Sequence, residues 1–146
     1  MVFDNRLVDE GLELLTDEEC WALLEGADVG RVGVTIGALP AIFPVNYAVI
    51  DRRIVFRTAP GSKLTAASAG AVVAFQVDNY ERADRSGWSV LAVGPAAVVH
   101  DLDVTFKVLA ARLQPWAEGK RTNIVRITPG FLSGRRIVHC RPSERR

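Results

Sequence analysis

Apolar and polar residues alternate with a period of two over much of the first half of the chain, and this pattern constrains the fold most strongly. The alternation is clear over residues 32–36, where it is typical of a β-strand with one buried face. Apolar residues return over residues 42–50 and 54–58, after turn signals at residues 37–40 and at Asp51-Arg52. Such short turns predict that successive strands pair in the antiparallel direction.

The second half of the chain returns repeatedly to strand character. Further strands are predicted over residues 71–77, 88–99, 124–127 and 135–138. In the longest of them, Gly94-Pro95 predicts a bulge or an edge position, because proline removes one donor from the strand ladder. Residues 78–87 are polar and charged, and they are predicted to form a solvated loop.

Short helices are expected between the strands. Thr16, with Glu19 three residues later, is the signature of a capping box and predicts the start of the first helix. A second helix is predicted over residues 62–69 and a third over residues 101–113. Because strands and helices do not alternate regularly, these elements predict a mainly β fold, built as a closed or partly closed antiparallel barrel.

Composition assigns this fold to a single domain. The chain has 146 residues, which suits one domain over residues 1–146, with its core at residues 15–138 and a basic tail at residues 139–146. Hydrophobic residues make up 49% of the chain, which is more apolar surface than a small lone domain needs. This surplus predicts a buried subunit interface or a buried cofactor.

Charge and cysteine content argue against several classes of function. The formal net charge is +1, which gives no electrostatic reason to expect nucleic-acid binding. No apolar run approaches the roughly 20 residues that span a bilayer, and the first residues do not resemble an export signal, so we expect no membrane partner. Two distant cysteines, Cys20 and Cys140, predict free thiols in a reducing cytoplasm.

Motifs for most kinds of catalysis are missing. The chain has two histidines, His100 and His139, and no further ligand at metal-binding spacing, so no metal site is predicted. A nucleophile elbow, a P-loop and a dinucleotide fingerprint are absent as well. Asp101 and Asp103 are better explained as the acidic first turn of a helix than as a catalytic pair. No catalytic residue is therefore assigned.

Residues 56–64 are the most informative segment. A strand that ends in Arg57 and Thr58 runs through a Pro-Gly turn into a helix that begins with Ser62 and Lys63. N–H groups at a helix start, with a hydroxyl and two cations beside them, can bind a phosphate. A capped surface helix with two solvated cations would have the same sequence, so both interpretations stay open at this point.

Most of the chain, from about Leu15 to Ile137, resembles the pyridoxamine 5′-phosphate oxidase-like family of flavin-binding proteins. Phe56-Arg57-Thr58, followed after three residues by Ser62-Lys63-Leu64, is similar to the phosphate-binding signature of that family. Further motifs resemble its small flavin-nucleotide-binding subgroup: Gly30-Arg31-Val32, Pro44-Val45-Asn46-Tyr47, Arg85-Ser86-Gly87-Trp88-Ser89-Val90, Pro115-Trp116 and Gly134-Arg135-Arg136-Ile137. The resemblance rests on the joint order and spacing of these motifs.

The resemblance implies a six-stranded antiparallel split β-barrel with a few short helices, and it implies a cofactor site. Proteins of this fold bind FMN in a groove at a homodimer interface, so the phosphate would lie on Arg57, Ser62 and Lys63. The backbone of two strands would line the edge of the isoalloxazine ring. These residues are Pro44, Val45, Asn46 and Tyr47 in one strand and Phe56, Arg57 and Thr58 in the next.

Three side chains are implied to contact the flavin ring itself. Asn46 is the best candidate for a hydrogen bond, although an asparagine at a strand edge would look the same. Trp88 would come from the opposite subunit and pack near the ring, and Trp116 would cover it. Each tryptophan could instead fill the core or an interface.

The resemblance implies an FMN-dependent oxidoreductase that transfers hydride to or from an unidentified small molecule, with the ring chemistry supplied by the flavin. A non-catalytic flavin carrier or redox sensor is an alternative, and so is a member of the fold that binds the deazaflavin F420 or haem. The additional basic residues of true pyridoxamine phosphate oxidases have no recognisable equivalent in this sequence. We therefore do not expect pyridoxamine phosphate to be the substrate.

Overall fold

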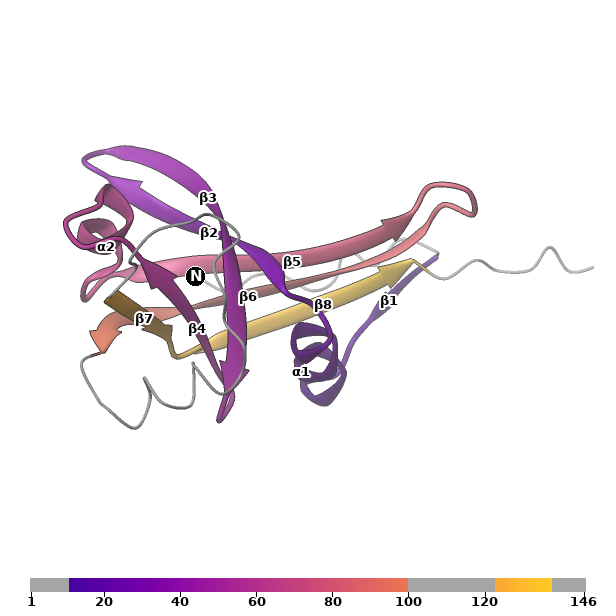
Figure 1. Cartoon of the computed structure of the whole chain (residues 1–146). Helices are drawn as coiled ribbons and strands as arrows, with labels where there is room; N and C mark the ends of the chain where they lie inside the picture. Colours follow the sequence, from indigo (N-terminus) through magenta and orange to yellow (C-terminus); the bar gives the residue numbers. More distant parts are fainter. Residues whose placement is uncertain (1–10, 100–122, 138–146) are drawn as a thin grey trace, which may run out of the picture.

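The computed structural model describes residues 11–99 and 123–137, which form a strongly curved β-structure with two helices (Figure 1). The strands are β1 (Leu12–Leu14), β2 (Val29–Ile36), β3 (Leu39–Ile50), β4 (Arg53–Thr58), β5 (Val72–Glu81), β6 (Ser86–Val99), β7 (Asn123–Ile127) and β8 (Phe131–Ile137). The helices are α1 (Asp17–Glu25) and α2 (Lys63–Ser68). The helix predicted over residues 101–113 lies outside the described residues.

Six of the strands close into an antiparallel barrel. The order across the sheet is β1-β8-β6-β5-β2-β3-β4-β7, and β6 also pairs with β7, which joins the two sides of the ring. β8 and β1 continue the sheet from β6 outside this ring. The predicted fold class, a mainly β six-stranded antiparallel barrel with a few short helices, is confirmed.

Two long strands, β3 and β6, each change partner partway along their length. β3 pairs with β2 as far as Asn46 and with β4 from Tyr47 onward. β6 pairs with β8 as far as Val93 and with β7 from Ala96 onward. These two changes split the barrel, because the partners of one strand separate at the point where the pairing switches.

Gly94 lies at the change of partner in β6, where another backbone approaches very closely. A Cβ atom on Gly94 would lie 2.1 Å from the carbonyl oxygen of Thr128, so only glycine fits here. The predicted bulge or edge position is wrong on the β5 side, because the β5–β6 register runs without interruption to the pair of Val72 with Pro95. Pro95, which has no N–H group, lies where β6 changes its partner from β8 to β7. The carbonyl oxygen of Pro95 accepts a hydrogen bond from the Thr128 N–H.

The turn between β3 and β4 has the geometry that a tight antiparallel connection requires. Asp51 and Arg52 have φ angles of 50° and 56°, both in the left-handed region. A two-residue turn with positive φ at both positions matches the right-handed twist of the flanking strands. The predicted turn at Asp51-Arg52 is confirmed, and it fixes the β3–β4 register.

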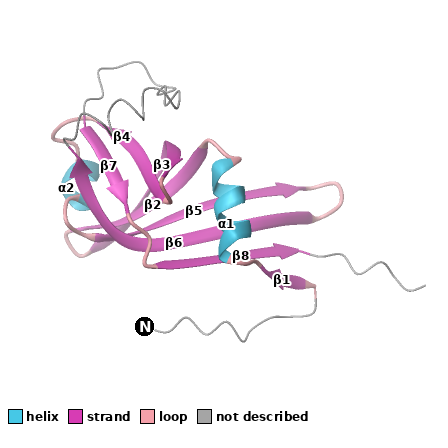
Figure 2. Cartoon of the chain, turned by 90° about the horizontal axis from the view of Figure 1, so that it is seen from below, coloured by secondary structure: helices cyan, strands magenta, loops and turns pink. Residues whose placement is uncertain are grey.

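Helix α1 covers the sheet where β8 extends it beyond the barrel (Figure 2). The predicted capping box is present, since Thr16 and Glu19 exchange side-chain to backbone hydrogen bonds. Cys20 and Leu24 of α1 are fully buried against the sheet. Cys20 is a free thiol, as predicted, and burial raises its pKa, with Asp17 and Glu19 adding to the effect. Within the described parts of the chain, neither helix is long and apolar enough to cross a membrane.

The hairpin of β5 and β6 is longer than predicted. Residues 78–87 were expected to form a loop, but β5 continues to Glu81 and β6 begins at Ser86, so only four residues remain for the turn. The prediction is wrong because this end of the hairpin extends beyond the barrel, where polar side chains are tolerated on a paired strand. Tyr80, for example, is 73% exposed. The short strand β1, which pairs with β8, was not predicted either.

Replacing Gly94 with alanine should destabilise the fold strongly, because the backbone of Thr128 cannot move away without breaking the β6–β7 junction. We expect Gly94→Ala to lower the free energy of unfolding by about 3 kcal/mol or more, at the upper end of overpacking effects. Gly33→Ala is the matched control, since its Cβ would meet only ordinary contacts at 3.5 Å. Urea unfolding measures both, and equal losses in the two variants would contradict the role given to Gly94.

Candidate functional site

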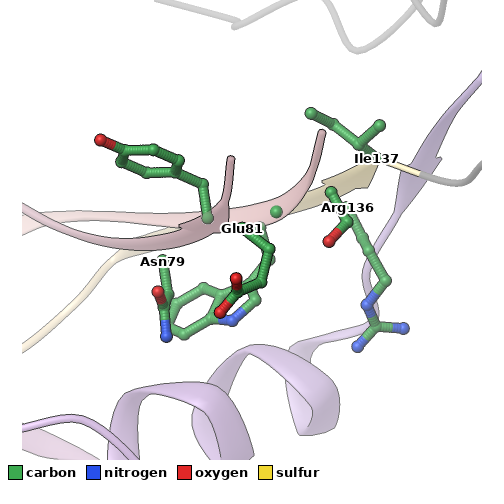
Figure 3. Close-up of a pocket in the computed structure, with 8 residues that line it drawn as sticks. Asn79, Glu81, Arg136 and Ile137 are labelled. Atoms are coloured by element: carbon green, nitrogen blue, oxygen red, sulfur yellow. The ribbon is translucent and has the colours of Figure 1, made fainter. Parts of the chain in front are cut away.

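A pocket of about 260 Å³ lies at the far end of the β5–β6 hairpin, on the side of the sheet that α1 covers. Asn79, Trp88 and Arg136 are paired in register across β5, β6 and β8, so their side chains share this side. Figure 3 shows Asn79, Glu81 and Arg136 on one side of the strands and Ile137 on the other. The indole of Trp88, with a carboxylate and a guanidinium nearby, makes this pocket suitable for a flat, polar-edged group.

A second pocket of about 260 Å³ lies on the opposite, outward side of the same strands. Tyr80, Gly87, Ile137 and Leu12 are paired in register across this side. Because Gly87 has no side chain, the row has a notch between Tyr80 and Ile137. Sequence reasoning missed both pockets, since it treated residues 78–87 as a loop and so could not align Tyr80 with β8.

Trp88 and the predicted phosphate-binding residues face different sides of the sheet. Trp88 lies on the same side of β6 as the buried Val90 and packs against the core. Arg57 follows the buried Phe56 in β4, so it points to the outer face. Trp88 therefore does not face Arg57 within its own chain. Trp116 lies outside the described residues.

The other predicted site residues meet where β3 and β4 part. The last pair between these strands is Tyr47 with Phe56, so Asn46 and Arg57 are the first residues beyond it. From Asn46 toward its start, β3 is paired with β2 instead, and Pro44 lies opposite Arg31. The predicted ring-binding backbone and the predicted phosphate-binding segment therefore border the same opening between two strands.

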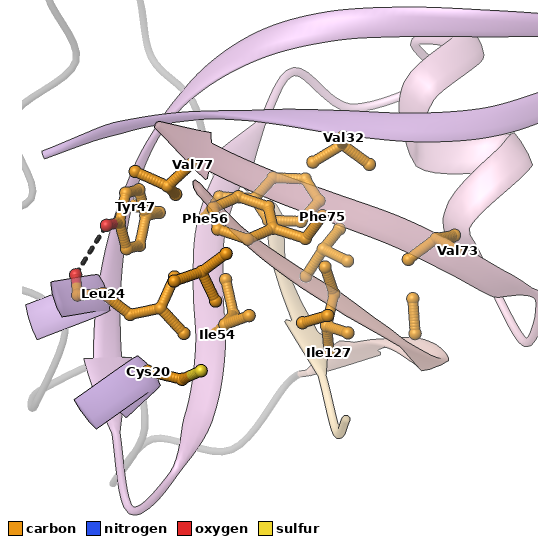
Figure 4. Packing of buried hydrophobic residues seen from close by; sticks show 14 of the residues in the cluster. Cys20, Leu24, Val32, Tyr47, Ile54, Phe56, Val73, Phe75, Val77 and Ile127 are labelled. Atoms are coloured by element: carbon orange, nitrogen blue, oxygen red, sulfur yellow. Dashed lines mark hydrogen bonds between the residues drawn. The ribbon is translucent and has the colours of Figure 1, made fainter. Parts of the chain in front are cut away.

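Strand alternation decides which side chains face this opening from outside the barrel. Tyr47, Phe56 and Thr58 are 5%, 0% and 2% exposed, and the two aromatic rings belong to the core (Figure 4). Their neighbours Asn46 and Arg57 consequently point to the outer face. Tyr47, Phe56 and Thr58 can contribute only backbone groups to a ligand here, as the resemblance implied for this stretch.

Tyr47 fastens β3 to α1. Its buried hydroxyl donates a hydrogen bond to the carbonyl oxygen of Leu24, as the dashed line in Figure 4 marks. Burial raises the pKa of the Tyr47 phenol, and the carboxylate of Asp28 raises it further. Tyr47 therefore stays neutral and engaged in the core, and it is not a proton donor for a ligand on the outer face.

A cluster of hydroxyl groups fixes the turn between β4 and α2. Ser62 caps α2 by accepting a hydrogen bond of 3.1 Å from the Thr65 N–H, as predicted for an N-cap. The Thr65 hydroxyl lies 2.8 Å from the Ser62 hydroxyl, 2.8 Å from that of Thr58 and 3.0 Å from the carbonyl oxygen of Ala59. The buried hydroxyl of Thr58 thus holds the start of α2, with Ser62 and Lys63, close to the end of β4.

The charge of this segment suits an anion. Residues 53–71 contain Arg53, Arg57 and Lys63 and no aspartate or glutamate. Lys63 is exposed and Arg57 is half-buried beside the opening. A phosphate at this position would meet cations from both ends of the turn. In the parts of the chain that the structure describes, no group of His, Cys, Asp and Glu is arranged to hold a metal ion.

Comparison with known proteins gives three findings. The family model described as pyridoxamine 5′-phosphate oxidase matches residues 16–136. An uncharacterized protein of Mycobacterium tuberculosis, Rv0080, is 38% identical over 129 residues, covering 85% of this chain and 84% of that protein. A solved structure named as the FAD binding protein from Mycobacterium smegmatis is 35% identical, with a TM-score of 0.74, and the match covers 85% of this chain and 97% of the other.

A second solved structure agrees with the first. It is named as an FAD-binding protein from Mesorhizobium loti and is 27% identical to this chain. The TM-score is 0.70, and the match covers 86% of this chain and 97% of the other. Both matches thus cover most of this chain and nearly all of the other.

Thr65→Val should loosen the turn that carries Ser62 and Lys63. The valine removes the hydroxyl that bridges Thr58, Ala59 and Ser62 and leaves the buried Thr58 hydroxyl without that partner. We expect the free energy of unfolding to fall by about 1–3 kcal/mol, the usual range for a buried polar group that loses its partner. Thr65→Ser keeps the hydroxyl and should lose much less in the same urea titration. Similar losses in the two variants would show that the hydroxyl network does not hold the turn.

Proposed function

The chain belongs to the pyridoxamine 5′-phosphate oxidase family, and from this membership we propose that it binds a flavin nucleotide where β3 and β4 part. The observation that carries the proposal is the meeting of two segments at this opening. One is the cationic, hydroxyl-fixed turn from Arg57 to Lys63, and the other is the stretch of β3 from Pro44 to Asn46. A phosphate and a flat ring are the two parts of the ligand that these segments would bind.

The residues present fit a riboflavin 5′-phosphate group. Arg57 and Lys63 offer guanidinium and ammonium donors, and Ser62 offers a hydroxyl at a position fixed by Thr65. FMN carries this group, as the resemblance implied, and FAD carries the same group as the inner half of its diphosphate. The names of the Mycobacterium smegmatis and Mesorhizobium loti proteins, both FAD-binding, support a flavin at this site. The deazaflavin F420 and haem are the alternatives that the fold leaves open.

The isoalloxazine ring would lie against β3, with its edge toward the backbone of Pro44, Val45 and Asn46. Asn46 is half-buried and points to the outer face, so its amide can contact a ring that lies there. The bound flavin would supply hydride transfer, which makes an oxidoreductase acting on a small molecule the proposed activity. Protein residues would orient the ring and limit its access to water. Tyr47, bonded to Leu24, supplies no proton there, which favours a flavin carrier or redox sensor as the second candidate.

We further propose that the protein works as a homodimer, with each flavin site completed by Trp88 of the partner subunit. Large apolar side chains are exposed on the outer face of the sheet: Val29, Ile42, Val72, Tyr80 and Ile137. A second copy would cover them, and a stable dimer buries about 800 Å² on each partner. Trp88 faces the core side of the sheet in its own chain and Arg57 faces outward, so a second copy would have to bring a tryptophan to the site. Both arguments favour the same assembly.

Replacing Arg57 and Lys63 together with alanine should weaken the binding of FMN far more than that of riboflavin. Loss of two charged phosphate contacts predicts an increase of at least about a hundredfold in the Kd for FMN, with riboflavin changed by less than about threefold. The double variant Arg82→Ala, Arg85→Ala removes the same charge from the β5–β6 turn and is the control. Flavin fluorescence quenching gives all the constants. Equal losses for FMN and riboflavin would show that Arg57 and Lys63 do not hold the phosphate.

The shared site can be tested by mixing subunits. The Trp88→Ala variant lacks the tryptophan but keeps Arg57 and Lys63, and the double variant with alanine at positions 57 and 63 lacks the phosphate contacts but keeps Trp88. Each variant on its own should therefore bind FMN poorly as a homodimer. A heterodimer of the two would contain one intact site, and we expect mixing to restore binding to part of the wild-type capacity. Sedimentation at micromolar concentration should show a dimer throughout. A monomeric wild-type protein, or mixing without recovery, would contradict the proposed assembly.

A further inference from the structure

The pocket of about 260 Å³ on the α1 side of the β5–β6 hairpin shares only Trp88 with the proposed flavin site. One side of this pocket is a row of residues paired in register: Asn79 in β5, Trp88 in β6 and Arg136 in β8. Neighbouring strands lie about 4.8 Å apart, so the row spans roughly 10 Å, with Trp88 in the middle. The volume is below the roughly 300–1,000 Å³ of sites for drug-sized ligands, so the pocket fits a molecule with a single ring.

Trp88 gives the pocket an aromatic surface. Its side chain is half-buried and packs against the core cluster, so part of the indole is fixed while another part lines the pocket. Aromatic pairs gain more than the burial of an equal apolar area, because the edge of one ring is attracted to the face of the other. A flat aromatic ring is therefore the group that Trp88 favours.

Opposite charges lie toward two ends of the pocket. Among the described residues that line it, only Glu81 and Arg136 carry a charge, and Figure 3 shows both on the same side of the strands as Asn79. Glu81 is in β5 and Arg136 is in β8, with β6 between them, and the two positions are two residues out of register. Their backbones are therefore roughly 12 Å apart, which leaves room for a ring between the two charged groups.

Both charged groups are available to a ligand. Glu81 is exposed and has no cationic partner in the parts of the chain that the structure describes. The guanidinium of Arg136 lies 3.8 Å from the carboxylate of Glu13, farther than the 2.7–2.9 Å typical of a charge-assisted hydrogen bond. Because a guanidinium has five N–H donors, Arg136 can still bind an anion, and Glu13 itself does not line the pocket.

We propose that this pocket binds a small aromatic zwitterion, with its ring on Trp88, its amine at Glu81 and its carboxylate at Arg136. A molecule with only one of these charges would leave the opposite lining group unpaired. In the proposed homodimer Trp88 also borders the flavin of the partner subunit, so the ligand would lie beside that flavin, in the position of a substrate. This last step rests on the proposed function, whereas binding of the zwitterion does not depend on it.

Nuclear magnetic resonance of the isotope-labelled, full-length protein without added flavin tests the site. The probe is 4-(aminomethyl)benzoate, which carries an amine and a carboxylate at opposite ends of one ring. Benzoate and benzylamine each lack one of the two charges and are the matched ligands. We expect the probe to shift the indole N–H signal of Trp88, assigned with Trp88→Phe, with a Kd of about 1 mM or lower. Each matched ligand should bind at least about tenfold more weakly.

Two variants test the two ends of the pocket separately. Glu81→Gln should reduce the affinity for the probe to about that for benzoate, and it should leave the Kd for benzoate within about twofold of the wild-type value. Arg136→Gln should likewise reduce the probe to about the affinity of benzylamine. Arg135→Gln removes the neighbouring guanidinium, which lies on the opposite side of β8, and is the matched control. It should leave the preference for the zwitterion intact.

The outcomes separate this inference from the proposed function. Equal Kd values for the three ligands, or no shift of the Trp88 signal at about 10 mM probe, would overturn the inference and leave the flavin proposal intact. The comparison of ligands uses the wild-type protein, so it decides the matter even where a variant does not fold. Probe binding by a protein that binds no flavin would support the zwitterion site and contradict its position beside a flavin.

Discussion

The change of partner along β3 and β6 is the constraint on which the rest of the structure depends. Each of these strands is longer than any single partner can pair with, so each joins one neighbour at one end and a different neighbour at the other. The exchange in β6 needs Gly94, because the chain at Thr128 passes where a side chain would otherwise lie. The exchange in β3 occurs next to Tyr47, whose ring is in the core and whose hydroxyl is bonded to α1. Both switch points are thus fixed by packing.

The proposed function follows from the exchange in β3. Where β3 leaves β4, the outer face changes from a continuous sheet to two strand segments with a short helix beside them. Thr58, Ser62 and Thr65 hold that helix to the end of β4 through their hydroxyl groups. A rigid turn with Arg57 before it and Lys63 after it is suited to hold an anion in one position. The chemistry of a flavin would then be set by how the ring lies on β3 and by what a second copy adds.

Local patterns predicted the barrel well and its extension poorly. The alternation in β2, the capping box at Thr16 and the turn at Asp51-Arg52 are short-range signals, and the structure contains all three. The ends of β5 and β6 and the strand β1 lie outside the barrel, so they lack the apolar alternation that marks a buried face. Tyr80 in β5 is such a residue, exposed yet fully paired with Gly87. Only the register across three strands brings it beside Ile137.

The part of the candidate site whose residues are close together in the sequence could be predicted. Arg57, Ser62 and Lys63 lie within one strand–turn–helix segment, and the sequence places them together without tertiary information. The side of the sheet that Trp88 faces depends on the register of β6 with β5 and β8, which cannot be read from a motif. The burial of Tyr47, Phe56 and Thr58 likewise follows from which face of the sheet closes the barrel.

A crystal structure of the protein with a bound flavin nucleotide is the most direct test of the central claim. The account predicts the riboflavin phosphate within about 3 Å of the donors of Arg57 and Lys63. It predicts the ring on β3 beside Asn46, facing Trp88 of the partner subunit. A phosphate bound elsewhere, or a ring in the pocket beside Trp88 with no contact to residues 44–46 of any copy, would contradict it.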